Sequence, residues 1–597
     1  MSSRANSRDP AALLAAAEEA GRRGDNKAAA RNWEQLAKIA PHIPEVQNNL
    51  GVSLRAIGRM ADARRAFLMA LRLKPDYADA LSNLGSLQNA AGESLKAVET
   101  LRRARRLAPR DVDIAINLGN ALRNAGSADE ALEVYKSVED GPASSKARSA
   151  QGSLLIDLGR FGDAAEIYRS LCLADPGSID HPVDLAAALL KDGKPDDAMA
   201  VLEEAGARLA PTPRFLAARG VLRGRTGDFD AAIKDLRQAI AAEPENADHR
   251  YHLAGVLRAA ARPDEAISVL DEALKRHRDH PELTNALWLN CLYAGDFRRG
   301  WRLREKRWRS RYITSSMNDR GQKRWTPDLP KSRLIRLWGE QGIGDEIMFA
   351  RDLRAFLRLG WPVLLECDPR LHGLLGRQFA EIEIIANGDP RGDAADCQLP
   401  IGSLPAVLYP ESAPPAPDGH YMAADPALVA GMRDWLSGLP GGVKVGVSWR
   451  SKNPDMGPVK SMDPSEFAAF AADRDITLVN LQYGDCREDI ADVQSRCGIT
   501  IHEHPTLDRF NDMEGLAALI AALDAVLSTS NTTVHLAGAL GAPVQVLVPR
   551  AADWRWFRDI EASPWYPDVR VYRQPADGDW KGALRSAEND FTARFMA

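Results

Sequence analysis

Two patterns of apolar positions divide the chain. In its first half, small residues recur every 34 positions, with one step of 33, in an alanine column made of Ala29, Ala63, Ala97, Ala131, Ala165, Ala198, Ala232, Ala266 and Gly300. From Arg333 on, short apolar runs such as RLIRLW and PVLLEC alternate with helix-like segments. The fixed period indicates a repeat array, and the alternation indicates an α/β region.

Further columns keep the same phase. Five residues before the alanine column stand Gly24, Gly58, Gly92, Gly126, Arg160, Gly193, Gly227, Ala261 and Gly295. Twelve residues before it stand Gly51, Gly85, Gly119, Ser153, Ala186, Gly220 and Ala254. Small residues allow two helices to cross closely, and glycine permits the left-handed turn between them. The pattern resembles a tetratricopeptide (TPR) array of about nine units, which stack into a superhelix with a groove.

A row of amides follows the repeat. Asn49, Asn83 and Asn117 hold one position in successive units, and Gln151 and Asp184 continue it. These side chains are either solvated or form a ladder that binds a client polypeptide, since an amide offers a donor and an acceptor together. The TPR arrays of protein O-GlcNAc transferases carry asparagines in this phase, and that resemblance implies a polypeptide client.

The segment DFRRGWRLREKRWRSRY ends the array. We expect a capping helix with Trp301 and Trp308 inward and the basic residues solvated. The predicted domains are a solenoid over 10–311, a linker over 312–332, Rossmann-like halves over 333–438 and 439–575, and a C-terminal helix over 576–597. Few contacts are expected to cross the linker, so residues 1–310 should fold alone.

The strands of the second half are continuous apolar runs, which predict parallel sheets covered on both faces. Two such halves suggest two Rossmann-like domains facing a cleft, with ligands at the carboxyl ends of the strands. No G-x-G-x-x-G follows a first strand, and no phosphate-loop motif is present, so dehydrogenase and P-loop NTPase functions are disfavoured. The DRD at 473–475 is interpreted as a turn rather than a metal triplet.

Composition removes several classes. Net charge is −5, which disfavours nucleic-acid binding. The first residues lack the apolar core of a secretory signal, and the longest apolar runs are too short to cross a bilayer. Six scattered cysteines without C-x-x-C indicate reduced thiols. We therefore expect a cytoplasmic protein without membrane insertion.

Six blocks carry a family resemblance: GEQGIGDEIMFARDL, GVSWRS, LVNLQYGD, DMEGLAALIAALDAVLSTSNTTVHLAGALGAPVQVLVP, DWRW and SPWYP. They resemble the TPR-fused bacterial glycosyltransferases related to the ADP-heptose:lipopolysaccharide heptosyltransferases. The resemblance implies a GT-B fold and a nucleotide-sugar donor used without a metal. SNTTVHLAGALG and NLQYGD are most similar to members that modify flagellin with nonulosonic (sialic-acid-like) sugars.

The donor site is predicted in the second half. Ser530, Asn531, Thr532 and Thr533 begin a helix after an apolar strand, where amides and the helix dipole favour an anion, and His535 can reach the same ligand. The alternative is ordinary N-capping. Ser448, Arg450, Lys452 and Lys460 lie on a loop that either binds phosphate or is only soluble. Heptosyltransferases carry aspartate at the position of Ser530, so its absence disfavours ADP-heptose and fits a donor with its own carboxylate.

The acceptor loop is predicted around Gly342 and Gly344, whose bare backbone admits a substrate. Asp345, at the helix start, can take the proton of an attacking hydroxyl, and heptosyltransferases have their proposed base in the matching GD. Glu340 is the reserve candidate, and Asp345 could instead only cap the helix.

The combined interpretation is a metal-independent protein O-glycosyltransferase that transfers a sugar to Ser or Thr of a client in the TPR groove. By resemblance, the client is flagellin and the donor a CMP-activated pseudaminic- or legionaminic-like acid. A heptosyl- or hexosyltransferase acting on glycan or other proteins, and a TPR scaffold with an inactive transferase half, remain alternatives.

Overall fold

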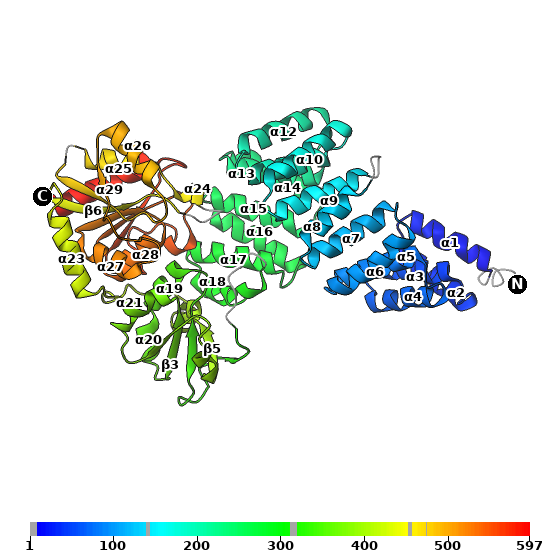
Figure 1. Cartoon of the computed structure of the whole chain (residues 1–597), viewed down its shortest axis with the longest axis horizontal. Coiled ribbons are helices and arrows are strands. Elements are labelled where there is room, and N and C mark those ends of the chain that lie inside the picture. Colours follow the sequence, from blue (N-terminus) through cyan, green and yellow to red (C-terminus); the bar gives the residue numbers. More distant parts are fainter. Residues whose placement is uncertain (1–8, 139–143, 311–318, 452–456, 473, 597) are drawn as a thin grey trace. The chain divides into compact units, whose positions relative to one another are not determined.

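The computed structural model describes residues 9–138, 144–310, 319–451, 457–472 and 474–596 (Figure 1). The chain forms two compact units, Met1–Leu222 and Arg223–Ala597. The predicted Lys452 and Asp473 lie outside the described residues.

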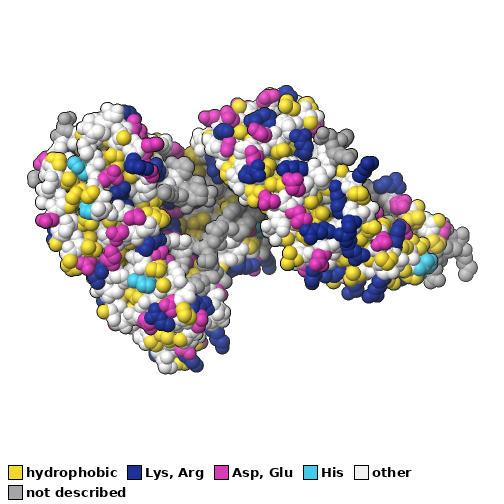
Figure 2. Space-filling model, in the orientation of Figure 1, with side chains coloured by type: hydrophobic (Ala, Val, Ile, Leu, Met, Phe, Trp, Pro, Cys, Tyr) yellow, Lys and Arg dark blue, Asp and Glu magenta, His cyan; other side chains and the backbone are white. Residues whose placement is uncertain are grey.

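The first unit consists of helices in antiparallel pairs, coloured blue to cyan in Figure 1. They are α1 (Pro10–Arg22), α2 (Asn26–Ile39), α3 (Pro44–Ala56), α4 (Met60–Leu73), α5 (Ala78–Ala90), α6 (Ser94–Leu107), α7 (Val112–Asn124), α8 (Ala128–Lys136), α9 (Ser144–Asp157), α10 (Phe161–Ala174), α11 (Asp180–Lys191) and α12 (Pro195–Arg208), and α13 (Pro213–Arg225) runs across the division. On the face seen in Figure 2, Lys and Arg side chains gather over the α6 region, where α6 exposes Arg102, Arg103 and Arg106.

The small-residue columns have the predicted physical cause. A Cβ added to Gly51 would lie 2.5 Å from the Phe67 ring, and one added to Gly85 would lie 2.5 Å from Leu101. In these two pairs the helices approach so closely that a larger residue at the glycine position would displace the facing side chain. Between the helices, Gly24 and Gly58 have φ of 75° and 81°, the left-handed turn that the sequence predicted.

The fifth unit shifts by one residue. Its left-handed residue is Gly159 (φ 73°) and its close-packed glycine is Gly152, against Tyr168, whereas the sequence columns had named Arg160 and Ser153. The buried alanine of that unit is correspondingly Ala164. The single short step of the repeat thus lies between the fourth and fifth units rather than after the fifth.

The second unit begins with the last repeats, α14 (Phe229–Ala242), α15 (Ala247–Ala259), α16 (Pro263–Arg276), α17 (Pro281–Ala294), α18 (Phe297–Arg304) and the short η2 (Arg307–Arg309). With α1 to α13, these make eighteen solenoid helices, or nine pairs, in the part of the chain that the structure describes. The predicted nine-unit helical array is confirmed.

Two parallel sheets follow, as predicted. The first has the order β1-β5-β2-β3-β4, and the second has the order β11-β10-β9-β6-β7-β8. The first half comprises β1 (Lys323–Arg324), β2 (Ile335–Trp338), α19 (Ile343–Ala350), α20 (Leu353–Leu357), β3 (Val363–Cys367), η3 (Pro369–Leu371), α21 (His372–Gly376), β4 (Glu383–Ala386), η4 (Pro390–Ala394), β5 (Cys397–Pro400), η5 (Ile401–Ser403), α22 (Leu404–Leu408) and α23 (Pro426–Ser437).

The second half comprises β6 (Val443–Ser448), α24 (Gly457–Lys460), α25 (Ser465–Ala471), β7 (Ile476–Asn480), α26 (Arg487–Cys497), β8 (Ile501–His502), α27 (Met513–Ala522), β9 (Ala525–Thr529), α28 (Thr532–Ala539), β10 (Val544–Val548), η6 (Trp554–Trp556), β11 (Val569–Arg573) and α29 (Trp580–Phe595). Strands β2, β3, β5, β9 and β10 are buried along their whole length, because helices cover both faces of each sheet.

The end of the solenoid belongs to the α/β core. Trp288 of α17 and Trp301 of α18 share one hydrophobic cluster with Phe349 of α19 and with Trp554 and Trp565. The Trp301 indole also donates to the Ser412 carbonyl at 3.1 Å. The expectation that few contacts cross between residues 1–310 and the rest is therefore wrong.

Other boundaries also differ from the predicted ones. Within the predicted linker, Lys323 and Arg324 form strand β1 beside β5, and Trp325 is buried. Helix α23, which the sequence analysis placed in the first half, packs against α27 of the second. No helix in the described ranges is both long and apolar enough to traverse a bilayer.

Candidate active site

In each sheet, the chain that follows a central strand first adds strands on one side of it and then crosses over to add strands on its other side. The central strand and its neighbour across this crossover are the pair of interest. Ligands of open parallel sheets bind at the carboxyl ends of such strands. The pair is β2 and β5 in the first sheet and β6 and β9 in the second. The two places are called here the first and the second switch point.

The first switch point is filled by the solenoid. Glu340 follows β2, and its two carboxylate oxygens accept from Arg307 Nε (2.8 Å) and Nη2 (2.7 Å). Arg304 Nη1 donates to the carbonyl of Gly402, which follows β5. All three side chains are buried. The predicted reserve base is therefore bound to a guanidinium through both oxygens, which argues against that role.

Arg304 links this ion pair to the aromatic core. Its guanidinium carbon lies 4.9 Å from the Phe349 ring, 5.7 Å from Trp288 and 5.8 Å from Trp554. Burial and the neighbouring Arg307 lower the pKa of Arg304 to about 9, and the same arginines hold the pKa of Glu340 below its usual value despite its burial. The expectation that the basic residues of this last unit are solvated is wrong for Arg304 and Arg307.

The second switch point is lined by neutral groups. Ser448, at the end of β6, donates to Gln482 Oε1 (3.1 Å) and accepts from Asn531 Nδ2 (2.7 Å). The same Gln482 oxygen accepts from the backbone N–H groups of Trp449 and Arg450. Asn531 Oδ1 accepts from the Thr533 N–H and so caps α28. These amides and hydroxyls fix the loop after β6 against the start of α28.

The starts of α19 and α28 meet directly. A Cβ added to Gly344 would lie 3.2 Å from His535 Cδ2 and 3.5 Å from Thr532 Oγ1, so the glycine makes this approach possible. Gly342 is exposed, and a Cβ there would meet nothing within 4 Å. Between β2 and α19, Gln341 has a left-handed φ of 69°, which a non-glycine residue adopts only when its surroundings enforce it.

A row of alternating charges lies beside this meeting point. Asp345 Oδ1 accepts from Arg555 Nε (2.8 Å) and Nη2 (2.6 Å), Arg555 Nη1 donates to Asp553 (2.6 Å), and Lys460 Nζ lies 3.8 Å from Asp553. Burial opposes the charges of Asp553 and Arg555, but their partners hold the pKa of Asp553 well below and that of Arg555 above its usual value. Both bonds from Arg555 end on Oδ1, so Oδ2 of Asp345 accepts nothing from the described residues.

The structure thus brings together Asp345, Gly344, Thr532, His535 and Lys460, although the sequence separates them by almost two hundred residues. It places other predicted donor residues differently. The Arg450 guanidinium pairs with Asp489 (3.1 Å) and donates to the Asp485 carbonyl (2.7 Å). Ser530 accepts from the Trp556 indole at 2.7 Å, and the Thr533 hydroxyl donates to the Leu481 carbonyl at 3.5 Å.

Sequence reasoning missed several residues here. Asp553 and Arg555 lie in the DWRW block, which had been noted for its resemblance but given no role. Glu346 was also passed over: its Oε2 accepts from the Asp368 N–H (2.8 Å), and burial raises its pKa to about 7. Only proximity in space distinguishes these groups from surface charges, so the sequence offered no signal beyond the DWRW block itself.

The solenoid holds the predicted client residues in one row. Asn49, Asn83, Asn117 and Gln151 lie on α3, α5, α7 and α9, the first helix of successive pairs. Asn83 Nδ2 donates to Asn48 Oδ1 and Asn117 Nδ2 to Ser82 Oγ, both at 3.0 Å, so each amide bonds the preceding repeat. Asn49 Oδ1 accepts from Asn48 Nδ2 at 3.4 Å, whereas Oδ1 of Asn83 and Oδ1 of Asn117 accept nothing from the described residues.

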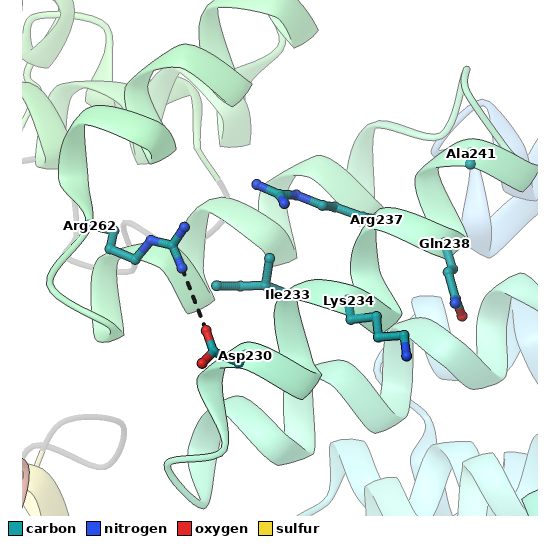
Figure 3. A pocket seen from close by; sticks show the side chains of 7 residues that line it. All are labelled: Asp230, Ile233, Lys234, Arg237, Gln238, Ala241 and Arg262. Atoms are coloured by element: carbon teal, nitrogen blue, oxygen red, sulfur yellow. Dashed lines mark ion pairs between the residues drawn. The ribbon is translucent and has the colours of Figure 1, made fainter.

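Two cavities open on solenoid helices. One of about 370 Å³ is lined by Gln151 with Arg148, Asp163 and Glu166. Another of about 460 Å³ is lined by Asp230, Lys234, Arg237 and Arg262, and Figure 3 shows Arg262 directed toward Asp230. Arg262 lies 3.8 Å from Asp230 there. Both cavities mix charges of either sign.

These features define the class of protein: a helical repeat array followed by a parallel α/β region. Comparison with known families agrees, since a tetratricopeptide-repeat model matches residues 155–222 and 225–287, and a second one matches 14–78, 83–148 and 116–179. The chain therefore contains TPR repeats, as the sequence columns predicted.

Among individual proteins, the chain is 27% identical over 475 residues to Protein FlbA of Caulobacter vibrioides, covering 74% of this chain and 79% of that protein. It is 30% identical over 143 residues to cellulose synthase operon protein C of Pseudomonas fluorescens, covering 23% and 11%. A solved tetratricopeptide repeat protein from Parabacteroides merdae is 18% identical with a TM-score of 0.36, covering 42% of this chain and 98% of that one.

Proposed function

We propose that this chain is a cytoplasmic GT-B glycosyltransferase that modifies Ser or Thr of a protein client held by its TPR groove. The observation that carries the proposal is the meeting of two helix starts, α19 and α28, from two different parallel sheets, beside Asp345. An anionic donor at the start of α28 and an acceptor hydroxyl at the turn of Gly342 and Gly344, called here the glycine turn, would then both lie within reach of the Asp345 carboxylate.

The charges fit this use. Asp345, Arg555, Asp553 and Lys460 sum to zero, so the centre itself does not repel a donor phosphate. Asp345 Oδ2 is the atom proposed to take the acceptor's proton, while Arg555 holds Oδ1. The electron pair of the leaving bond stays on the donor phosphate, next to the first-turn amides of α28.

The client and the sugar rest on the sequence resemblance described above. We propose flagellin as client and a CMP-activated nonulosonic acid, of the pseudaminic or legionaminic type, as donor. A neutral second switch point, with Ser530 in place of an aspartate, supports a donor that carries its own carboxylate, because a second carboxylate would repel it.

The first experiment identifies the nucleotide. CMP, UDP, ADP and GDP are compared by thermal shift, since a ligand at a hundred times its dissociation constant stabilises the folded state by about 2.7 kcal/mol. Stabilisation by CMP alone supports the nonulosonic donor, and stabilisation by ADP, UDP or GDP supports a heptosyl- or hexosyltransferase. If none binds, the chain is a TPR scaffold with an inactive transferase half.

The amide ladder is tested separately. Replacing Asn49, Asn83 and Asn117 together by Ala removes several hydrogen bonds, each contributing about 0.5–1.5 kcal/mol. Client affinity should fall tenfold or more while CMP binding is unchanged. Asn48→Ala is the matched control, because it removes the bond from Asn83 to the preceding repeat but leaves the ladder. Equal losses in both variants would mean that only repeat stacking was damaged.

A further inference from the structure

His535 is a titratable residue of the meeting point that carries no charge at neutral pH. Burial first, and then the nearby positive charges of Arg555 and Lys460, lower its pKa to about 3, although Asp553 opposes this. Asp345, the other carboxylate beside the ring, is bonded to Arg555. A third cation here would be repelled, and the imidazole therefore stays neutral.

The neutral ring is held on two sides. Nδ1 lies 2.5 Å from the Tyr566 hydroxyl, and the ring stacks on the Trp556 indole at 5.8 Å and an interplanar angle of 14°. Tyr566 is buried, and burial raises its pKa well above the usual value, so it keeps its proton. Gly538 makes room for it, because a Cβ there would lie 2.5 Å from the Tyr566 ring.

These contacts decide which nitrogen of His535 carries the proton. The Tyr566 hydroxyl and Nδ1 share one hydrogen bond, and its direction depends on the tautomer of the ring. The stronger arrangement has the hydroxyl donate, because a phenol O–H is a good donor with a weakly accepting oxygen and an unprotonated imidazole nitrogen is a good acceptor. A nitrogen that accepts a hydrogen bond has no proton, so the neutral ring carries its proton on Nε2. Nε2 is bonded to Cδ2, the atom that lies 3.2 Å from the place of the missing Gly344 Cβ. The N–H group therefore lies at the glycine turn.

We propose that Tyr566 is a positioning residue that fixes His535 as the neutral Nε2–H tautomer, so that the imidazole offers the donor's phosphate a hydrogen bond without adding a positive charge. The proposal rests on the proposed function for its substrate and adds a residue to it. As the bond from the anomeric carbon to the phosphate oxygen breaks, its electron pair stays on that oxygen, and the hydrogen bond from Nε2 strengthens. The proton stays on Nε2 throughout.

The direct test reads the tautomer in the whole protein without substrate. Histidine is labelled with ¹⁵N, and the His535 signals are assigned by their loss in His535→Gln. The expected result at pH 7 is a neutral ring with the proton on Nε2, and a growing share of the Nδ1–H tautomer in Tyr566→Phe. An imidazolium, an Nδ1–H ring in the natural protein, or no change in Tyr566→Phe would each overturn the proposal.

Tyr572→Phe is the matched control. Tyr572 is buried and its hydroxyl donates to Asp590 Oδ2 at 2.7 Å, so this variant removes a tyrosine hydrogen bond that does not involve His535. It should leave the His535 tautomer unchanged. Because this readout needs no turnover, it stands even if no nucleotide sugar is transferred, and a failure of the proposed function can be told from a failure of the tautomer lock.

A second experiment measures the rate of sugar transfer with the CMP-sugar as the probe. Loss of one preorganised donor typically lowers the rate about 10²–10³-fold, so His535→Ala should transfer that much more slowly at saturating donor. Tyr566→Phe should lose about tenfold, because part of the population keeps the active tautomer. His535→Gln, whose amide N–H can replace Nε2–H, should recover activity relative to His535→Asn. Equal rates for Gln and Asn would contradict the assignment of the proton to Nε2.

Discussion

The two switch points have the same topology and opposite contents. The first is filled by Arg304 and Arg307, which the solenoid inserts beside Glu340 and Gly402. The second is lined by Ser448, Asn531 and Gln482 and receives no arginine from the solenoid among the described residues. The position at which an open sheet usually binds its ligand is thus used for assembly in one half and is left to small polar groups in the other.

This difference indicates which of two neighbouring carboxylates has a structural role and which has a catalytic one. Glu340 and Asp345 are five residues apart, and both contact arginine. Glu340 uses both oxygens and is enclosed by protein, whereas Asp345 uses one and lies beside the glycine turn. We therefore expect Glu340 to govern stability and Asp345 to govern rate.

The largest effect should come from breaking the first switch point. Glu340→Gln removes the buried carboxylate that Arg304 and Arg307 share and leaves Arg307 only the partly exposed Glu305, 3.4 Å away, which costs about 3–5 kcal/mol of unfolding free energy. Denaturant unfolding followed by tryptophan fluorescence measures it, since Trp288, Trp301, Trp554 and Trp565 share this core. Glu411→Gln is the control: its exposed pair with Arg298 should cost less than about 1 kcal/mol. Equal losses would erase the contrast between a buried and an exposed pair.

Asp345→Asn tests the other side of the comparison. The amide keeps an oxygen for Arg555 but cannot accept the acceptor's proton, so single-turnover transfer should slow by a factor of about 10²–10⁴. The CMP dissociation constant should stay nearly unchanged. Transfer at the natural rate would place the base elsewhere. A loss of CMP binding instead would mean that donor and acceptor sides are reversed.

The second switch point predicts an order between two cations. Lys460 lies 3.8 Å from Asp553 in the charged row, whereas the Arg450 guanidinium is held by Asp489 and the Asp485 carbonyl. Lys460→Ala should therefore weaken CMP binding about tenfold, as loss of one charge-assisted contact does, and Arg450→Ala should weaken it less. Calorimetric titration of the two variants decides the order, and the reverse order would move the phosphate site toward Arg450.

The smallest effect should be that of a chelator. If the start of α28 and the basic side chains compensate the negative charge of the donor phosphate, sugar transfer should continue in excess EDTA. The check is the same single-turnover rate before and after chelation. Activity that disappears and returns with Mg²⁺ or Mn²⁺ would contradict the metal-independent mechanism.

The sequence predicted the parts of the fold that repeat or alternate. The 34-residue columns locate the solenoid helices because each small residue meets a specific neighbour, as Gly51 meets Phe67. Continuous apolar strands likewise predicted both parallel sheets. The one-residue shift at Gly152 and Gly159 was not predicted. A displacement by one residue hardly alters the repeat pattern in the sequence, but it changes which residue packs against the paired helix.

The candidate site was predicted only in pieces. GEQGIGD and STSNTT mark helix starts through local chemistry, so Gly344, Asp345 and Asn531 could be named in advance. Arg307 and Arg555 could not, since their partners lie 33 and 210 residues away in sequence. An arginine in a basic stretch has the same local signature whether it is solvated or fully buried, and only the fold separates the two cases.

The insertion of α18 into the α/β core bears on how such chains could exchange their specificity. A recombination point near residue 310 would separate Arg304 and Arg307 from Gly402 and Glu340, which they contact in this chain, and would leave Glu340 facing foreign side chains. A point near the division at Leu222 and Arg223 would carry the final repeats along with the sheets that need them. New protein partners are therefore most readily acquired by replacing the early repeats, while the last ones are inherited together with the α/β region.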